Sequence, residues 1–221
     1  MTAKTPRGRN RRGEGARLRE ELVEAASRLL ETLDGEESLS LRAVARTAGI
    51  APQSVYLHFA DRRELLTAVF RVRFAELREA LSAARGPDPQ ARLREICRAY
   101  CEYGLRNPGH YRVLFGTAGA PGWEPTDEQL PGLPVFRMMV DAVRDCGSAD
   151  PTATASCLWA GMHGLITLRQ DRPSFPWLEM DILLDTLVAA HLAAAGAGQG
   201  GGQASSNWVS ASRSGGVTCS P

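Results

Sequence analysis

The sequence predicts an all-α protein. Apolar residues recur every three or four positions along most of the 221 residues, which is the spacing of amphipathic helices. Glycine and proline fall between these stretches, where helices commonly end or begin. The chain has no convincing run of alternating apolar and polar residues of the kind that predicts a half-buried strand. These observations together predict a bundle of packed helices.

The first long amphipathic helix lies close to the N-terminus. Its end is predicted at Asp34 and Gly35, because glycine commonly follows the last turn of a helix. The apolar residues at helical spacing that define its buried face are Leu18, Leu22, Ala25, Ala26, Leu29 and Leu33.

Two short helices follow, separated by a glycine turn. Ser40 can cap the first of them, and Leu39 and Val44 have the spacing of a hydrophobic staple. Gly49 predicts a sharp turn, because glycine adopts a positive φ without a steric penalty. Pro52 suits the first position of the second helix, where the backbone N–H is not needed.

The second short helix has distinct inner and outer faces. Val55 and Phe59 form an inward stripe, which predicts that Phe59 belongs to the core. Two interpretations are open for Tyr56. It could simply be a packed core residue, or its ring could pack while its hydroxyl contacts a phosphate. The residues left on or near the outer face are Gln53, Ser54, Tyr56 and His58. This pair of helices predicts a DNA-binding helix-turn-helix.

A third helix start follows the two short helices, and further helices after it form a second domain. Asp61 with Glu64 has the spacing of a capping box, and it opens a long amphipathic helix that extends to Leu81. Breaks are predicted at Gly86–Pro89 and Asn107–Gly109, and residues 117–134 form a long Pro/Gly-rich stretch. The further helices predicted are 91–106, 135–146, 152–169 (capped by Asp150) and 178–194.

Residues 17–66 resemble the DNA-binding domain of the TetR (tetracycline repressor) family of bacterial transcription regulators. The resemblance rests on Ala45, Ala48-Gly49-Ile50, Val55-Tyr56, His58-Phe59, Arg62 and Leu65-Leu66. It implies phosphate contacts for Tyr56, His58 and Arg62. It places Arg42, Gln53, Ser54 and Tyr56 nearest the base edges, so that the expected DNA-binding residues are Ser40, Arg42, Pro52, Gln53, Ser54, Tyr56, His58 and Arg62. Ala51 departs from the pattern, because many members carry Ser or Thr there.

The second domain resembles the ligand-binding region of a TetR subgroup that is recognised by a Trp-His-Gly signature. The matching residues are the segment 107–116 with Trp159, His163 and Gly164. The resemblance implies a homodimer formed through helices 152–169 and 178–194, operator DNA as a partner, and a small-molecule effector that relieves repression. Aromatic and Met residues that could line the effector site, or simply pack in the core, are Tyr100, Tyr103, His110, Phe115, Met138, Met139, Trp159 and His163.

The complete expectation is an N-terminal three-helix helix-turn-helix domain joined by a long helix to a C-terminal helical ligand-binding and dimerisation domain. Residues 1–15 are expected to be a flexible basic arm that reaches DNA or merely solubilises the chain. Residues 16–66 would be the DNA-binding domain, residues 67–195 the second domain with its connecting helix, and residues 196–221 a disordered tail rich in Gly and Ser.

Composition limits the other classes of function. The chain lacks the apolar run of roughly 20 residues that a membrane span requires and lacks a secretory signal pattern, so a cytoplasmic location is expected. Cys97 and Cys101 share a helix face and could form a redox or metal site, but buried packing is favoured; no cofactor or metal is expected. The rival hypotheses are an enzyme using Cys101, His110 or His163, which no catalytic motif supports, and a DNA-coating protein without an effector.

Overall fold

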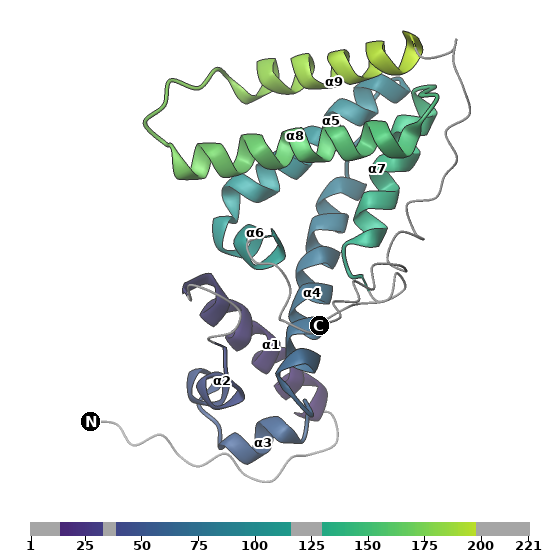
Figure 1. Ribbon diagram of the computed structural model, residues 1–221. Helices are drawn as coiled ribbons and strands as arrows, with labels where there is room; N and C mark the ends of the chain where they lie inside the picture. Colours follow the sequence, from purple (N-terminus) through teal and green to yellow (C-terminus); the bar gives the residue numbers. More distant parts are fainter. Residues whose placement is uncertain (1–13, 33–38, 116–129, 198–221) are drawn as a thin grey trace, which may run out of the picture.

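The computed structural model describes residues 14–32, 39–115 and 130–197, and within these ranges the chain is helical with no strand. A small group of helices, α1 to α3, lies at one end of the molecule, and α4 rises from it into a larger helical layer (Figure 1). The helices are α1 (Glu14–Thr32), α2 (Leu41–Ala48), α3 (Pro52–Tyr56), α4 (Arg62–Ser82), α5 (Pro89–Arg106), α6 (Pro108–Phe115), α7 (Leu133–Asp145), α8 (Pro151–Asp171) and α9 (Met180–Ala197).

The predicted caps of the helix-turn-helix are confirmed. Ser40 precedes α2 and its hydroxyl accepts the backbone N–H of Ala43 at 3.2 Å. Gly49 ends α2 with φ of 69°, the left-handed conformation that favours glycine. Pro52 is the first residue of α3, as its missing N–H predicts.

The start of α4 differs in one detail from the predicted capping box. The carboxylate of Asp61 accepts the N–H of Glu64 at 2.8 Å, as expected. The carboxylate of Glu64, however, accepts the N–H of Ala60 at 2.8 Å, one residue before the cap. The first contact satisfies a backbone donor that the helix itself leaves unpaired, and the second gives a partner to the N–H of the residue before the cap.

The N-terminal domain has a closed core that fixes the orientation of α3. The side chains of Leu22, Val44, Val55 and Phe59 have 0% exposure, which confirms that Phe59 belongs to the core. The guanidinium of Arg19 lies 4.6 Å from the centre of the Phe59 ring and covers it. Because this core buries Val55, the opposite, outer face of α3 points away from the rest of the domain.

The two domains are joined through polar contacts among α1, α4 and α6. Arg73 is only 4% exposed, and its Nε donates to the hydroxyl of Ser27 at 2.8 Å. Its other nitrogens pair with Glu24 of α1 and with Glu76. Gly109 of α6 lies so close to α1 that a Cβ atom would come within 2.5 Å of Glu31. The base of the C-terminal domain is therefore packed directly on α1.

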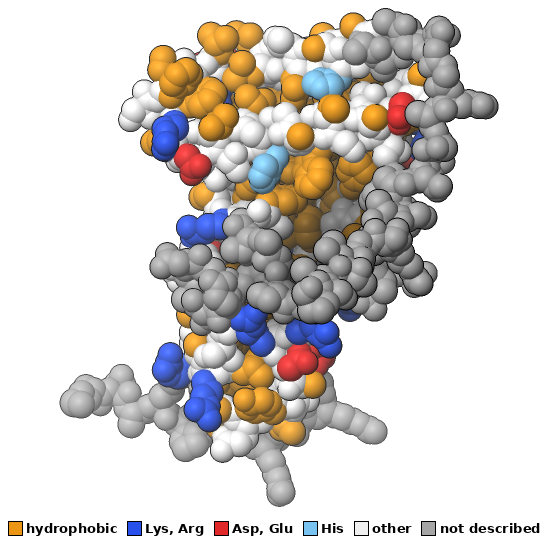
Figure 2. Space-filling view, in the orientation of Figure 1, with side chains coloured by type: hydrophobic (Ala, Val, Ile, Leu, Met, Phe, Trp, Pro, Cys, Tyr) orange, Lys and Arg blue, Asp and Glu red, His pale blue; other side chains and the backbone are white. Residues whose placement is uncertain are grey.

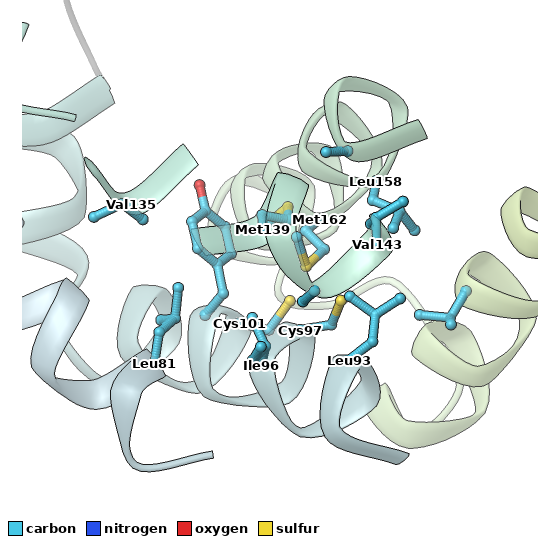
Figure 3. Close-up of a cluster of buried hydrophobic side chains, with 14 of the residues drawn as sticks. Leu81, Leu93, Ile96, Cys97, Cys101, Val135, Met139, Val143, Leu158 and Met162 are labelled. Carbon is cyan, nitrogen blue, oxygen red and sulfur yellow. The ribbon is translucent and has the colours of Figure 1, made fainter. Parts of the chain in front are cut away.

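The larger domain has its own apolar core, to which all the helices from α4 to α9 contribute. Figure 3 shows Met139 and Met162 packed in the same cluster as Cys97 and Cys101. Both cysteines are fully buried, which confirms the packing interpretation, and burial raises the pKa of each thiol to about 12. They are therefore inert thiols at neutral pH.

The element boundaries bring several corrections. Helix α1 begins at Glu14, inside the segment expected to be an arm. The segment after Asn107 is a helix, α6, rather than an irregular break, because Pro108 serves as a helix start. The predicted arm before residue 14, the end of α1 at Asp34 and Gly35, most of the Pro/Gly-rich stretch and the tail from residue 198 lie outside the described residues.

Candidate DNA-binding surface and aromatic cluster

The outer face of α3 is open to solvent. Pro52 and Gln53 are exposed, and Tyr56 keeps 56% of its surface accessible, while Ser54 is half-buried. Arg42 of α2 is exposed beside this face, and Ser40 serves as the cap of that helix. The residues predicted to read DNA are therefore displayed on adjacent helices rather than absorbed into the core.

His58 and Arg62 are half-buried at the junction of α3 and α4. The imidazole of His58 lies near the start of α1, with its Cε1 atom 3.8 Å from the Cβ position of Gly15. Sequence reasoning missed Leu57, which follows α3 and is 82% exposed. The helical spacing of apolar residues did not single out Leu57, because this side chain lies outside the inward stripe.

Basic side chains accompany this face. Arg42, Arg46 and Arg63 are exposed around α2, α3 and the start of α4. Figure 2 shows Lys and Arg side chains gathered on the lower part of the visible face, around the small N-terminal domain, whereas hydrophobic side chains gather on the upper part. Such an arrangement suits contact with a polyanion.

A cluster of aromatic residues from α5, α6, α7 and α8 forms the second candidate site. The ring of Phe115 lies at its centre, 4.7 Å from Tyr111, 5.5 Å from His163 and 6.1 Å from Trp159. The ring of Phe136 lies 6.1 Å from Trp159 on the other side. In Figure 2, hydrophobic side chains line a hollow below α8, between α6 and α7.

Polar atoms within this cluster form a continuous chain. The indole N–H of Trp159 donates to the hydroxyl of Tyr100 at 2.9 Å. The hydroxyls of Tyr100 and Tyr111 are 3.0 Å apart, and the hydroxyl of Tyr111 is 2.7 Å from Nδ1 of His163. Burial raises the pKa values of both tyrosines and lowers the pKa of His163. All four groups are therefore uncharged at neutral pH.

The structure brings some of the predicted effector residues together and separates others. Tyr100, Phe115, Trp159 and His163 meet in the aromatic cluster. Met139 is 1% exposed and belongs to the core, and Met138 packs beside that core. The Tyr103 hydroxyl bonds the backbone carbonyl of Arg73 at 3.4 Å.

His110 faces the domain junction rather than the aromatic cluster. Its Nε2 atom lies 3.2 Å from a carboxylate oxygen of Glu31 on α1, and its Nδ1 atom lies 3.7 Å from a carboxylate oxygen of Glu76 on α4. Because α6 turns neighbouring residues to different sides, Tyr111 faces the cluster instead. Sequence reasoning missed Tyr111, although it lies within the segment that carried the Trp-His-Gly resemblance.

Acidification is expected to destabilise the protein through His163. Its pKa is lowered by burial from the ordinary 6.5, so the unfolded chain binds this proton more readily than the folded chain. Because neutral His163 fits the folded state, folding has its full free energy above the ordinary pKa. Part of that free energy is lost as pH falls through the lower pKa of the folded state. Urea denaturation between about pH 7 and pH 5 should show a smaller loss of stability for His163→Gln than for the wild type. Equal losses would contradict this role of His163.

Two family models match the chain over complementary regions. Residues 22–69 match the family described as bacterial regulatory proteins, tetR family, and residues 93–195 match the family described as tetracyclin repressor-like, C-terminal domain. The chain belongs to the TetR family. The matched regions coincide with the helix-turn-helix and with the helices that carry the aromatic cluster.

The chain is also similar to individual proteins and solved structures. The nucleoid occlusion factor SlmA of Citrobacter koseri is 30% identical over 104 residues, which is 45% of this chain and about half (52%) of that protein. A structure of a protein with unknown function from Rhodococcus sp. RHA1 has 26% identity and a TM-score of 0.67, covering 80% of this chain and 95% of that chain. The transcriptional regulator FadR from Bacillus subtilis, in complex with stearoyl-CoA, shares the fold with a TM-score of 0.64 and 11% identity, covering 78% and 97% of the two chains.

The chain therefore belongs to a family of bacterial regulatory proteins rather than to a family of enzymes. Within the described residues, no cluster of His, Cys, Asp or Glu has the grouping of a metal site. In the same part of the chain, no helix is both long and apolar enough to cross a membrane.

Proposed function

We propose that the protein is a ligand-responsive homodimeric repressor that releases its operator when a small molecule binds the C-terminal domain. The observation that carries this proposal is the position of α6 between the two candidate sites. Tyr111 and Phe115 of α6 belong to the aromatic cluster, whereas Val113 of the same helix packs into the core of the N-terminal domain. A shift of α6 caused by a ligand would therefore act directly on α1.

Contacts along α6 support this coupling. His110 lies against Glu31 of α1 and Glu76 of α4, and Gly109 allows the backbone of α6 to approach Glu31. Because a ligand shifts an equilibrium only by its differential affinity for the two states, a difference of about 1 to 3 kcal/mol changes operator affinity roughly fivefold to 150-fold. Effects of this size are sufficient to relieve repression.

The proposed dimer forms through α8 and α9, which lie together on one side of the larger domain (Figure 1). Large apolar side chains stay exposed on and between these helices, including Leu168 at 51%, Leu178 at 59% and Ile182 at 52%. Ala160, Ala189 and Ala190 are exposed as well. Such faces pair readily as a four-helix bundle with a twofold mate.

One small residue of α8 lies at the contact with α9 of the same chain rather than in the proposed dimer surface. A Cβ atom at Gly161 would lie 2.7 Å from the side chain of Leu187 in the same chain. Gly161 therefore allows α8 and α9 of one protomer to approach each other. Gly164, by contrast, has open space at its Cβ position and stays in the proposed surface.

In the proposed dimer, α3 of each protomer enters the major groove of a near-palindromic operator. Two such helices must be separated by about 34 Å, one turn of DNA, to read both half-sites. Gln53 and Ser54 would contact base edges with Arg42 nearby, and Tyr56, His58 and Arg62 would contact phosphates. Ser40 and Pro52 would set the position of α2 and α3 through their helix starts.

Two substitutions on α3 should separate base reading from phosphate contact. Gln53→Ala is expected to relax preference at one base pair of each half-site, because a lost base contact is worth about 1 to 3 kcal/mol. Tyr56→Phe, which removes only a hydroxyl, is expected to weaken binding to every sequence by roughly fivefold. Fluorescence anisotropy with an operator and its single-base variants measures both effects. The same loss on every sequence for both variants would contradict the assignment of Gln53.

A DNA-coating role without an effector is the second candidate, and the similarity to the nucleoid occlusion factor over about half of that protein favours it specifically. Such a protein would bind with strong salt dependence but with little regard to sequence. A repressor would instead prefer its operator by several orders of magnitude at physiological salt. Competition of labelled operator with unlabelled random DNA distinguishes the two functions.

A further inference from the structure

The polar chain in the aromatic cluster has a defined direction. The indole nitrogen of Trp159 can only donate a hydrogen bond, so the Tyr100 oxygen must accept there. Tyr100 is 1% exposed, and its single hydroxyl hydrogen has a partner only if it is donated to Tyr111. Tyr111 must then donate its own hydrogen to Nδ1 of His163.

The reverse direction would leave a buried donor without a partner. If Nδ1 of His163 donated to Tyr111 and Tyr111 donated to Tyr100, the Tyr100 oxygen would accept twice. Its hydrogen would then have no acceptor among the described residues. An unpaired buried hydroxyl is unfavourable by roughly 1 to 3 kcal/mol, so the first direction is preferred.

The direction fixes the tautomer of His163. With Nδ1 accepting from Tyr111, a neutral imidazole carries its proton on Nε2. His163 is the last member of this series of hydrogen bonds and is partly exposed. Within the described part of the protein, its Nε2 atom has no hydrogen-bond partner. Trp159, one helical turn away on α8, is 40% exposed. The cluster therefore presents one N–H donor on an otherwise aromatic surface.

We propose that the effector is a largely apolar molecule that carries one uncharged hydrogen-bond acceptor, such as a ketone carbonyl, which accepts from Nε2 of His163. This rests on the proposed function, because it specifies the ligand of the same site. Phe115, Phe136 and Trp159 supply the apolar contacts. The four polar groups of the chain are neutral, so they offer a carboxylate or a phosphate no opposite charge.

The tautomer can be tested without any effector. In the full-length protein with ¹⁵N-labelled histidine, long-range proton–nitrogen NMR correlations distinguish a protonated Nε2 from a protonated Nδ1. We expect the Nε2-protonated form of His163 at neutral pH. Tyr111→Phe, which removes the donor to Nδ1, should allow a mixture of tautomers. A wild-type His163 protonated at Nδ1 would overturn the direction of the chain and the proposal with it.

The chemical class can be tested with matched probes by isothermal titration calorimetry. Fluorenone and fluorene have nearly the same shape, but only fluorenone has a carbonyl acceptor. We expect fluorenone to bind roughly fivefold more tightly, the effect of one hydrogen bond, and to lose this advantage in His163→Phe. The control His191→Phe should keep the tighter binding of fluorenone, because His191 is not part of the aromatic cluster. It lies on α9, where its Nδ1 atom is 2.7 Å from the carbonyl oxygen of Leu187.

Other outcomes would overturn the proposed class. Equal binding of fluorenone and fluorene, or no binding of either, would exclude the role of the Nε2 donor. Tighter binding of fluorene carboxylate or of stearoyl-CoA would show that the site takes anions. Operator release is measured separately with each probe. If fluorenone bound with the expected dependence on His163 but left operator affinity unchanged, the site chemistry would stand and the proposed effector response would fail.

Discussion

Ala160→Glu is expected to convert the proposed dimer into monomers and to lower operator affinity by on the order of a hundredfold or more. Ala160 is exposed on α8, in the face that we propose pairs with a second copy. Twofold symmetry would bury two new carboxylates in one interface, and an unpaired buried charge is unfavourable by several kcal/mol. A monomer has a single recognition helix and loses the second half-site.

Sedimentation velocity measures this change directly, alongside operator binding by fluorescence anisotropy. The matched control is Ala75→Glu, which places the same side chain at an exposed position in the middle of α4, away from α8 and α9. The control should remain dimeric. If Ala160→Glu were also dimeric with full operator affinity, the proposed interface would be wrong.

Phe59→Ala is expected to lower the free energy of unfolding by about 3 to 5 kcal/mol, the usual effect of removing a buried phenyl ring. Phe59 is fully buried and lies beneath the guanidinium of Arg19. The cavity would lie directly behind α3. Operator binding should therefore be lost together with the stability of the N-terminal domain.

Urea denaturation followed by circular dichroism measures the loss of stability. Leu57→Ala is the control in the same domain, because Leu57 is 82% exposed and its truncation should change stability by less than about 0.5 kcal/mol. Phe59→Leu keeps most of the buried volume and should retain a folded domain with a smaller loss. Equal stability of Phe59→Ala and the wild type would contradict the central position of Phe59 in the core.

Local signals in the sequence predicted much of the fold. Ser40, Asp61 and Asp150 cap helices as expected, because a capping side chain contacts a backbone N–H only three residues ahead. Gly49 has the left-handed conformation that its place in the turn required. The inward stripe of Val55 and Phe59 depended only on helical spacing, and both residues are buried.

The parts that sequence reasoning missed depend on contacts between distant segments. Arg73 is buried because Glu24 and Ser27 of α1 and Glu76 of its own helix surround its guanidinium. No local pattern distinguishes such an arginine from an exposed one. In the same way, His110 and Tyr111 are neighbours in sequence, and only the packing of α6 decides that one faces α1 and the other faces His163.

The most direct test of the central claim is selection of bound sequences from a random pool of double-stranded DNA at physiological salt, with the purified full-length protein and with Tyr56→Ala. A homodimeric repressor should enrich an inverted repeat whose half-sites lie about one helical turn apart. Tyr56→Ala should weaken or abolish that enrichment. Binding without any enriched sequence, or the same repeat enriched equally by Tyr56→Ala, would contradict operator recognition through the outer face of α3.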